Sequence, residues 1–463
     1  MAEQQGLADK AKKLNLEDIK NIAQGACFLG TGGGGSLQVA LTKIIPECLE
    51  EANVSLVELD SLTEKDWGAI VTGIGSPLEL FHDPTIVTAA HSAYKELEKL
   101  CLAFKSSDSK RYRSLERMNF CLPAEIGAVN SIVPIIVANE ISLKSDSAPV
   151  FVVDADGAGR AIPTLPLTLY AQAQESKPKP QAQESESKAQ AQESESKAQA
   201  QESESKAQAQ ESESKAQAQE SESKPKRKLS IYPNILGGTI KGQKNFNYGS
   251  LNVPNEATLE TAIVGMIKSK NFGVVSGLAI YAANGPTFQD CHLVPNGIKH
   301  SLAIGEIINN NTNRDRLDSV LAYINTTMKR CAKQVFYGQV TYVEEKTQGL
   351  DTGVIQITGE GDFQGEFLTI FIENENIWSQ KTKTQDRQKS PDDAWIVSPD
   401  SMNYLTDEGN VFDNSDLEKL FLKQKQPMVR IIAVEAAKEV RGNSKLRKIG
   451  YKKLKKKVGL TNI

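Results

Sequence analysis

Histidine and cysteine are scarce in this chain of 463 residues, which contains four histidines and six cysteines. No two cysteines form a C-x-x-C pair, so neither a disulfide framework nor a zinc ribbon is indicated. The shortage of histidine also argues against a His-rich metal centre. Scattered single cysteines are typical of reduced thiols, and we therefore expect a cytoplasmic protein.

Long apolar runs are missing as well. Residues 1–13 are polar and mixed in charge, without the apolar core of a signal peptide, and no stretch has the length of a transmembrane helix. A net charge of -4 and an isoelectric point near 5.8 argue against a general nucleic-acid binder. We expect a small-molecule substrate as the partner, with no specific nucleic acid and no transmembrane segment, and we leave a homo-oligomer open.

Residues 171–228 have almost no apolar side chain larger than alanine. They include four identical copies of the unit AQAQESESK between residues 189 and 224. Stacked units of this composition would bury nothing, which excludes a solenoid. The segment is predicted to be a disordered insertion, with a marginal solvated helix as the alternative. We favour a neutral repeat expansion over a partner-binding role.

The chain before the insertion alternates apolar strands with helices. Strands are predicted over 54–59, 68–75, 118–122 and 149–153, and helices from residue 16 and over 84–102. This alternation is typical of an α/β fold. Since ligands collect at the carboxyl ends of strands in such sheets, the loops 73–77, 123–130 and 154–160 are expected to converge on one crevice.

The chain after the insertion reads as helices followed by strands. Helices are predicted over 256–268, 297–308 and 316–331, an apolar strand over 273–282, and period-two strands over 335–343, 352–358, 367–373 and 393–398. The expected organisation is an N-terminal α/β sheet domain (1–170), the low-complexity repeat insertion (171–228), a mixed, β-rich C-terminal domain (229–440) and a basic tail (441–463). The tail has nine lysines and arginines and no acid between 441 and 457. It is interpreted as a solvated terminus, with contact to anionic lipid or nucleic acid as the alternative.

A glycine-rich loop, GACFLGTGGGG, spans residues 25–35. Gly32, Gly33, Gly34 and Gly35 carry no side chain that would block a ligand, so their amides are candidates for binding an anion, a carbonyl or an oxyanion. Ser36 is expected to cap a helix that follows. A turn that lets two elements pack closely is the structural alternative. Nucleotide binding is a further alternative, although residues 16–24 look helical where a dinucleotide fold needs a strand.

Acidic residues follow two of the predicted strands. Glu125 shares a loop with Asn130, while Asp154 and Asp156 begin the next loop, and carboxylates in such places suit general acid or base work. Arg160 is a candidate for binding a planar polar ligand. Together these groups suit the addition of water to a C=N or C=O carbon. The alternatives are turn chemistry with an Asp154–Arg160 ion pair, and a hard divalent cation such as Mg²⁺. Cys27 is interpreted as a buried thiol rather than a nucleophile.

Three of these segments resemble the signature blocks of the S-methyl thiohydantoin desulfurase family, a group linked to hydantoin utilisation. They are GACFLGTGGGG at 25–35, PAEIGAVN at 123–130 and VDADGAGRAIP at 153–163. Segments 295–306 and 371–376 also resemble the family. The resemblance implies an N-terminal α/β domain, a β-rich C-terminal domain and hydrolytic removal of methanethiol from an S-methylated thiohydantoin. Ile162 and Thr164 depart from the aromatic and the acid that the family pattern has there.

The leading hypothesis is therefore a hydrolase of a small cyclic amide or a thiohydantoin ring. Glu125 or Asp156 would act as the base, Arg160 and the glycine amides would bind the polar edge of the ring, and Asn130 would position the base. No cofactor is part of this hypothesis. The competing hypothesis is a catalytically inactive binding protein that retains the fold.

Overall fold

The computed structural model describes residues 7–75, 85–107, 110–144, 149–172, 229–238, 246–269, 272–273, 275–310, 315–347, 351–385 and 389–457. Most of the repeat insertion, from residue 173 onward, lies outside these ranges. Ala171 and Gln172, placed in the insertion from the sequence, instead end a short helix, α8 (Leu169–Gln172).

The first sheet has eight described strands in the order β1-β2-β5-β4-β3-β9-β7-β8. Its centre is parallel and consists of β2 (Val54–Val57), β5 (Phe151–Val153), β4 (Phe120–Leu122) and β3 (Trp67–Gly75). Antiparallel strands flank it: β1 (Lys12–Leu14), β9 (Val275–Asn284), β7 (Ile235–Gly238) and β8 (Asn247–Gly249). The predicted α/β sheet is confirmed. Three of its strands follow the insertion, so the sheet extends past the boundary drawn at residue 229.

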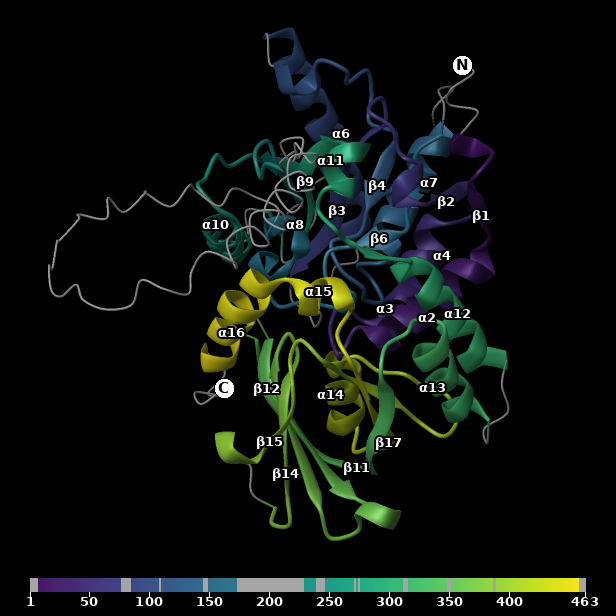
Figure 1. The fold of residues 1–463 in the computed structure, drawn as a ribbon, viewed down its shortest axis with the longest axis vertical. Coiled ribbons are helices and arrows are strands. Elements are labelled where there is room, and N and C mark those ends of the chain that lie inside the picture. Colours follow the sequence, from purple (N-terminus) through teal and green to yellow (C-terminus); the bar gives the residue numbers. More distant parts are fainter. Residues whose placement is uncertain are drawn as a thin grey trace, which may run out of the picture. The chain divides into compact units, whose positions relative to one another are not determined.

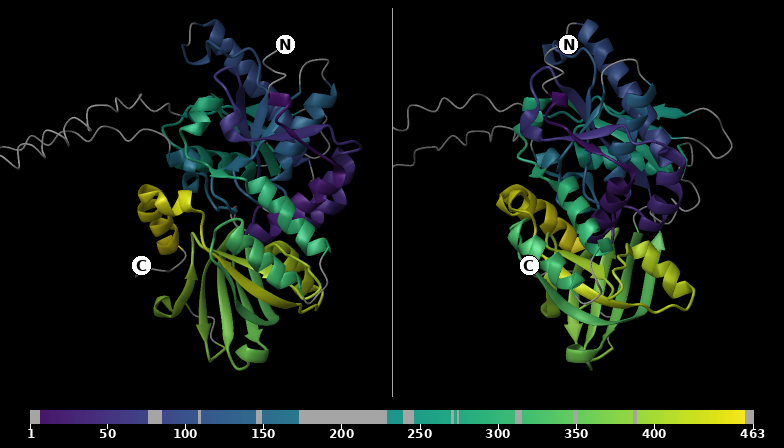
Figure 2. Two further views of the ribbon diagram at one scale, coloured as in Figure 1. Left: turned by 45° about the vertical axis from the view of Figure 1, so that its right-hand side comes forward. Right: turned by 90° about the vertical axis from the view of Figure 1, so that its right-hand side faces the viewer.

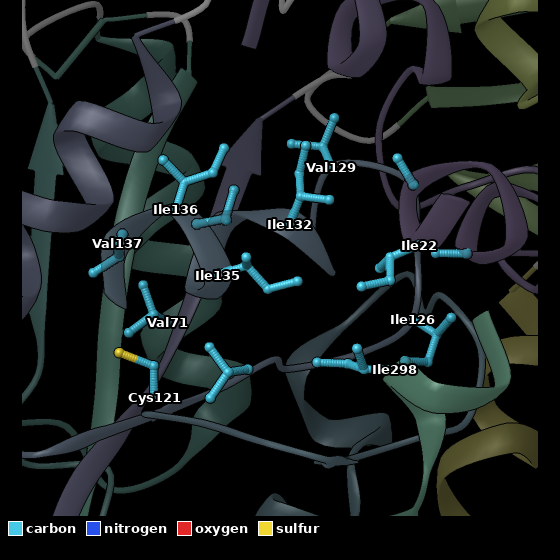
Figure 3. Packing of buried hydrophobic residues seen from close by; sticks show 14 of the residues in the cluster. Ile22, Val71, Cys121, Ile126, Val129, Ile132, Ile135, Ile136, Val137 and Ile298 are labelled. Carbon is cyan, nitrogen blue, oxygen red and sulfur yellow. The ribbon is translucent and has the colours of Figure 1, made fainter. Parts of the chain in front are cut away.

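Side chains alternate between the two faces of the sheet along each strand, and both faces are covered by other parts of the chain. Ala69 and Val71 of β3 belong to one apolar cluster, whereas Ile70 between them belongs to a second cluster. The first cluster also takes in α6 (Ile86–Ser106) and α7 (Ile132–Lys144). Figure 3 shows part of that packing, with Val71 and Cys121 near Ile135, Ile136 and Val137. No described helix is long and apolar enough to cross a membrane.

Local sequence explains how the first long helix, α2 (Leu16–Leu29), begins and packs. Asn15 and Asp18 exchange hydrogen bonds of 2.9 Å, a capping box that satisfies two backbone amides. The helix packs closely against α12 (Gly297–Asn310). A Cβ atom at Gly25 would lie 1.9 Å from the carbonyl oxygen of Ser301, and one at Gly305 would lie 2.0 Å from that of Asn21. Both glycines are therefore required by the close approach of the two helices.

The second sheet is antiparallel and curves as a half-barrel (Figures 1 and 2). Its described order is β15-β14-β13-β12-β11-β17-β16, formed by β11 (Ala332–Thr347), β12 (Asp351–Gly359), β13 (Phe367–Glu373), β14 (Glu375–Thr382), β15 (Ala394–Val397), β16 (Ser401–Leu405) and β17 (Met428–Val434). The predicted strands over 335–343, 352–358, 367–373 and 393–398 are confirmed. The strands β14, β16 and β17 were missed.

The remaining described elements are short or lie at the edges of the sheets. They are α3 (Leu37–Val39), α4 (Ile45–Cys48), β6 (Ala155–Asp156), α10 (Glu256–Lys268), α11 (Gly285–Gln289), β10 (Val294–Pro295), α13 (Arg316–Thr326), α14 (Asn414–Leu422), the π-helices Ala40–Ile44 and Leu446–Tyr451, and the 3-10 helices Leu59–Ser61, Lys110–Tyr112, Leu165–Leu167, Gly361–Phe363 and Pro391–Asp393. The helix predicted over 316–331 was too long, because α13 ends at Thr326 and β11 begins at Ala332.

The described part of the basic tail, up to Lys457, is folded, contrary to the prediction of a solvated terminus. It forms α15 (Lys438–Gly442), the π-helix over 446–451 and α16 (Lys452–Lys457), drawn in yellow in Figure 1. Leu446, Tyr451 and Leu454 are at most 5% exposed and join the second apolar cluster. Apolar side chains between the lysines therefore anchor this segment to the core.

Candidate active site

Two loops, which follow β4 and β5, meet beside the carboxyl end of β3. Of the loop predicted over 73–77, residues 73–75 belong to β3, and residues 76 and 77 lie outside the described residues. The side chain of Asn130 accepts a hydrogen bond of 3.1 Å from the amide of Gly73. The loop that carries Asn130 is joined to the next loop by two backbone bonds, from Ile126 to the carbonyl of Arg160 at 3.3 Å and from Gly157 to the carbonyl of Ala124 at 3.1 Å. The parallel strands thus bring together segments that are far apart in the sequence, as the strand order of an α/β sheet requires.

Glu125 lies at the centre of this meeting point. Its Oε1 accepts a 2.7 Å hydrogen bond from Nδ2 of Asn130, and its Oε2 accepts one of 2.7 Å from the amide of Ile162. Because Gly73 donates to Oδ1 of Asn130, the amide group of Asn130 must turn its Nδ2 toward the carboxylate. Glu125 is therefore held from both sides.

Burial raises the pKa of Glu125 to about 7, although the hydrogen bonds from Asn130 and Ile162 lower it. The nearby charge of Asp156 raises the pKa as well, and that of Arg160 lowers it. A carboxylate with a pKa near neutrality can accept a proton from water and release it again. These are the properties of a general base.

Asp156 and Asp154 are more deeply enclosed than Glu125. Their exposed fractions are 0% and 1%, compared with 6% for Glu125. Oδ1 of Asp156 accepts from the amides of Ala158 and Gly159, whereas its Oδ2 has no hydrogen-bond partner among the described residues. Burial raises the pKa of Asp156 to about 7. Glu125 is therefore the least buried of the three carboxylates.

Asp154 caps the start of α12 from a distant part of the chain. Its Oδ1 accepts from the amides of Ile298 at 2.9 Å and Lys299 at 3.3 Å. Its Oδ2 lies 3.9 Å from Nζ of Lys299 and has no hydrogen bond among the described residues. Burial raises the pKa of Asp154 to about 7. The Asp154–Arg160 ion pair considered from the sequence is absent from the described part of the chain.

Arg160 fastens the loop after β5 to the second sheet. It is 2% exposed. Its Nη1 donates to the hydroxyl of Ser398 at 3.0 Å and to the carbonyls of Pro399 and Asp400 at 3.1 and 2.9 Å, and its Nη2 donates to the carbonyl of Asn376 at 3.1 Å. Most of its N–H groups are therefore used by the protein, and substrate binding by Arg160 stays a prediction.

The glycine-rich loop packs against the site and against the second sheet. Gly32, Gly34 and Gly35 have φ angles of +83°, +76° and +92°, a region that favours glycine. Added Cβ atoms at the four consecutive glycines would lie 2.4–2.5 Å from atoms of the residues that cover them, which are Asn414, Glu375, Gly127 and Val129 in order. Close packing accounts for each glycine.

The Cα atoms of the glycine-rich loop are closely packed, but not all of its backbone amides donate a hydrogen bond within the described residues. Within the described ranges, the amides of Gly34 and Gly35 donate to no other group, so ligand binding by these amides stays a prediction. Ser36 caps α3, as expected, by accepting a 3.2 Å bond from the amide of Val39. The preceding element is α2, so the strand that a dinucleotide fold needs is replaced by a helix.

Two residues near the site were not named as candidates from the sequence, although Glu375 lies in the segment 371–376 that resembles the family. Glu375 begins β14 and covers Gly33. Tyr451 is 1% exposed, its hydroxyl has no hydrogen-bond partner among the described residues, and the charges of Arg160, Glu375, Glu125 and Asp400 act on its phenol. The spacing of Leu446, Tyr451 and Leu454 between the lysines was the available signal for a packed tail.

Neither a cluster of metal ligands nor a reactive thiol is found among the described residues of this site. Among the residues that the structure describes, no three His, Cys, Asp or Glu side chains are grouped so as to hold a metal ion. This includes Glu125, Asp154 and Asp156, for which a divalent cation had been considered. Cys27 is 1% exposed, and burial raises its pKa well above the usual value, which agrees with a buried, unreactive thiol.

Two family models together match most of the chain. The model described as S-Me-THD-like, N-terminal domain matches residues 17–191, and that described as S-Me-THD-like, C-terminal domain matches residues 255–453. The crystal structure of a protein from Chromobacterium violaceum is similar, with a TM-score of 0.67, 17% identity, and coverage of 97% of this chain and 98% of that one. At this identity the likeness shows the fold alone. No curated protein matches the chain.

Proposed function

This chain belongs to the S-Me-THD-like (S-methyl thiohydantoin desulfurase-like) family, and we propose that it is a hydrolase of an S-methylated thiohydantoin or another small cyclic amide. The observation that carries this proposal is the geometry of Glu125, held by Asn130 and Ile162 with a pKa of about 7. A positioned base of this kind serves the addition of water to an electrophilic ring carbon.

In the proposed reaction Glu125 activates water for attack on the ring carbon that carries the S-methyl group. A C–O bond forms, and the electron pair of the C=N bond moves onto the ring nitrogen. The C–S bond then breaks, and methanethiol leaves as the carbonyl forms. The two protons of water end on the ring nitrogen and on the sulfur, and Glu125 carries them. No oxidant or reductant is required.

The other groups of the site have supporting roles in this proposal. Asn130 positions Glu125 and fixes its protonation behaviour through the 2.7 Å hydrogen bond. The amides of Gly34 and Gly35 would donate to the polar edge of the ring. Arg160 would act through its charge, which lowers the pKa of Glu125, because its N–H groups already bind the protein.

The test is methanethiol release from S-methyl thiohydantoin by the purified protein. Turnover that Glu125→Gln lowers by about 100-fold or more supports the proposal. Glu98→Gln is a matched control, because Glu98 is also buried and accepts a 2.7 Å bond from an amide, that of Met118, beside the opposite end of β4. Absence of turnover across a panel of hydantoins would favour the competing hypothesis of an inactive binding protein.

A further inference from the structure

Tyr170 lies where the two loops of the site meet. It belongs to α8 and is fully buried, and its hydroxyl donates a hydrogen bond of 2.9 Å to the carbonyl of Pro123. Pro123 directly follows β4 and stands two residues before Glu125. The hydroxyl of Tyr170 therefore holds the backbone of the loop that carries Glu125, close to Glu125 itself.

The ring of Tyr170 contacts the other loop. A Cβ atom at Gly157 would lie 2.5 Å from Cε2 of Tyr170 and 2.8 Å from the carbonyl oxygen of Ala124, so these groups pack without room for a side chain at Gly157. The amide of Gly157 donates to that same carbonyl at 3.1 Å, and the carbonyl of Gly157 accepts from the amide of Leu169 at 2.8 Å. Tyr170 thus fixes the spacing of the two loops through its ring as well as through its hydroxyl.

Neighbouring aromatic side chains hold the ring of Tyr170 in turn. Tyr281 stacks on it with 6.0 Å between the ring centroids, and Phe288 meets it edge-on at 6.2 Å. Tyr281 has a φ angle of +61°, and its hydroxyl donates to Oε1 of Glu256 at 2.7 Å. A positive φ angle outside glycine persists only where the surrounding structure imposes it. The position of Tyr170 is therefore set by a closely packed group of side chains.

The position of Glu125 depends on both loops at once. Its Oε1 accepts from Asn130 in its own loop, whereas its Oε2 accepts from Ile162 beyond the other loop, each at 2.7 Å. A displacement of one loop relative to the other would therefore lengthen the bond from Ile162. Burial raises the pKa of Glu125 and the bond from Ile162 lowers it, so a longer bond would raise this pKa further.

We propose that Tyr170 is a positioning residue that keeps the carboxylate of Glu125 at hydrogen-bond distance from the amide of Ile162. It does so by holding the carbonyl of Pro123 and by covering Gly157, and it touches no reacting atom itself. This inference rests on the proposed role of Glu125 as the base. It assigns the short helix α8 to the support of the site.

The test is Tyr170→Phe, which removes the hydroxyl and keeps the ring. Because Glu125 then needs a higher pH to ionise, the acidic limb of the pH profile of kcat/KM for methanethiol release should move up by about half a pH unit or more. The value of kcat should fall by about tenfold, while KM stays unchanged. The titration of Glu125 itself should move by the same amount. It is followed by ¹³C NMR of protein labelled in its glutamate carboxyl groups and is assigned with Glu125→Gln.

Tyr94→Phe is the matched control. Tyr94 is also fully buried, and its hydroxyl donates a 3.1 Å bond to the carbonyl of Phe120 in the same strand, β4, at the end away from Glu125. Each variant loses one buried hydrogen bond, so both should lower the thermal midpoint by a similar amount, about 2–4 °C. Only Tyr170→Phe should move the pH limb and the titration of Glu125.

The outcomes separate this inference from the function on which it rests. An unmoved titration of Glu125 in Tyr170→Phe, or an equal shift in Tyr94→Phe, would overturn the positioning role and leave the hydrolase proposal intact. A wild-type protein that releases no methanethiol would overturn the hydrolase proposal. The NMR titration needs no turnover, so a shift confined to Tyr170→Phe would still support the positioning of Glu125 by Tyr170.

Discussion

Asn130 links Glu125 to the end of β3, because it donates to Glu125 at 2.7 Å while it accepts from the amide of Gly73 at 3.1 Å. Since the bond from Asn130 lowers the pKa of Glu125, Asn130→Ala should raise that pKa above about 7. The base must be ionised to act, so the acidic limb of the pH profile of kcat/KM should move to higher pH.

The control for this prediction is Asn139→Ala. Asn139 is equally embedded in hydrogen bonds, accepting from the amide of Asn53 at 2.6 Å and donating to the carbonyl of Glu51, but it lies away from Glu125 in α7. It should lower stability without moving the pH limb. An unmoved limb in Asn130→Ala would contradict the assignment of Glu125 as the base.

The contribution of Asp156 to the free energy of unfolding should fall as the pH rises. Its pKa is about 7 in the folded protein, above its ordinary value of 3.8, so the folded state holds more protons than the unfolded state between about pH 4 and pH 7. The free energy of unfolding therefore falls as pH rises through this window. Asp156→Asn should reduce the slope by up to about 1.4 kcal/mol per pH unit, as measured by denaturant unfolding from pH 4 to pH 8.

Asparagine suits this test because its Oδ1 can still accept from the amides of Ala158 and Gly159. Asp362→Asn, at an exposed position in the second sheet region, is the control and should leave the wild-type slope. Equal slopes for Asp156→Asn and the wild type would show that Asp156 is ionised when folded.

Gly25→Ala should destabilise the protein through the crossing of α2 and α12. The new Cβ would lie 1.9 Å from the carbonyl oxygen of Ser301, and forcing two packed helices apart costs about 1–3 kcal/mol. Gly265→Ala is the control within a helix, because a Cβ at Gly265 has nothing within 4 Å. It should be neutral or stabilising by up to about 1 kcal/mol. Thermal unfolding measures both, and similar effects would contradict the close crossing.

Gly34→Ala should lower the free energy of unfolding by more than the strain of a positive φ angle alone would. Alanine at φ +76° is strained, and its Cβ would also lie 2.4 Å from Cα of Gly127. Gly361→Ala isolates the first effect, because Gly361 has φ +61° and open space around it. We expect about 1–2 kcal/mol for Gly361→Ala and a larger loss for Gly34→Ala, measured by denaturant unfolding. Equal losses would mean that the loop moves away from Gly127 freely.

The sequence predicted the part of the site that follows from strand order. Strands of period two or continuous apolar character mark β3, β4 and β5, and the ends of parallel strands share one edge of a sheet. The contact of Gly73 with Asn130, and the contacts of the loop 123–130 with the loop 154–160, follow from that rule. The α/β class and the family were predicted correctly for the same reason, since the signature blocks lie in these loops.

The contributions of the second sheet and the tail could not be predicted in this way. Strand β14 buries Asn376, Ser379 and Gln380, so it lacks the apolar alternation by which strands are recognised. In the tail, Leu446 and Tyr451 stand between lysines and arginines in the sequence. The charged residues predict a solvated segment, and the few apolar residues are too sparse to predict a packed one. Which of these residues approaches Glu125 depends on pairings between distant segments, and local sequence carries no signal for those.

Thr31, within the glycine-rich loop, exchanges hydrogen bonds with the backbone of Met402, 371 residues further along the chain. During synthesis at about 5–20 residues per second, the loop would leave the ribosome roughly 20–75 s before its partner strand exists. The contact between this loop and β16 therefore forms only after most of the chain has been made, and a truncated translation product would carry the signature glycines and Glu125 without it.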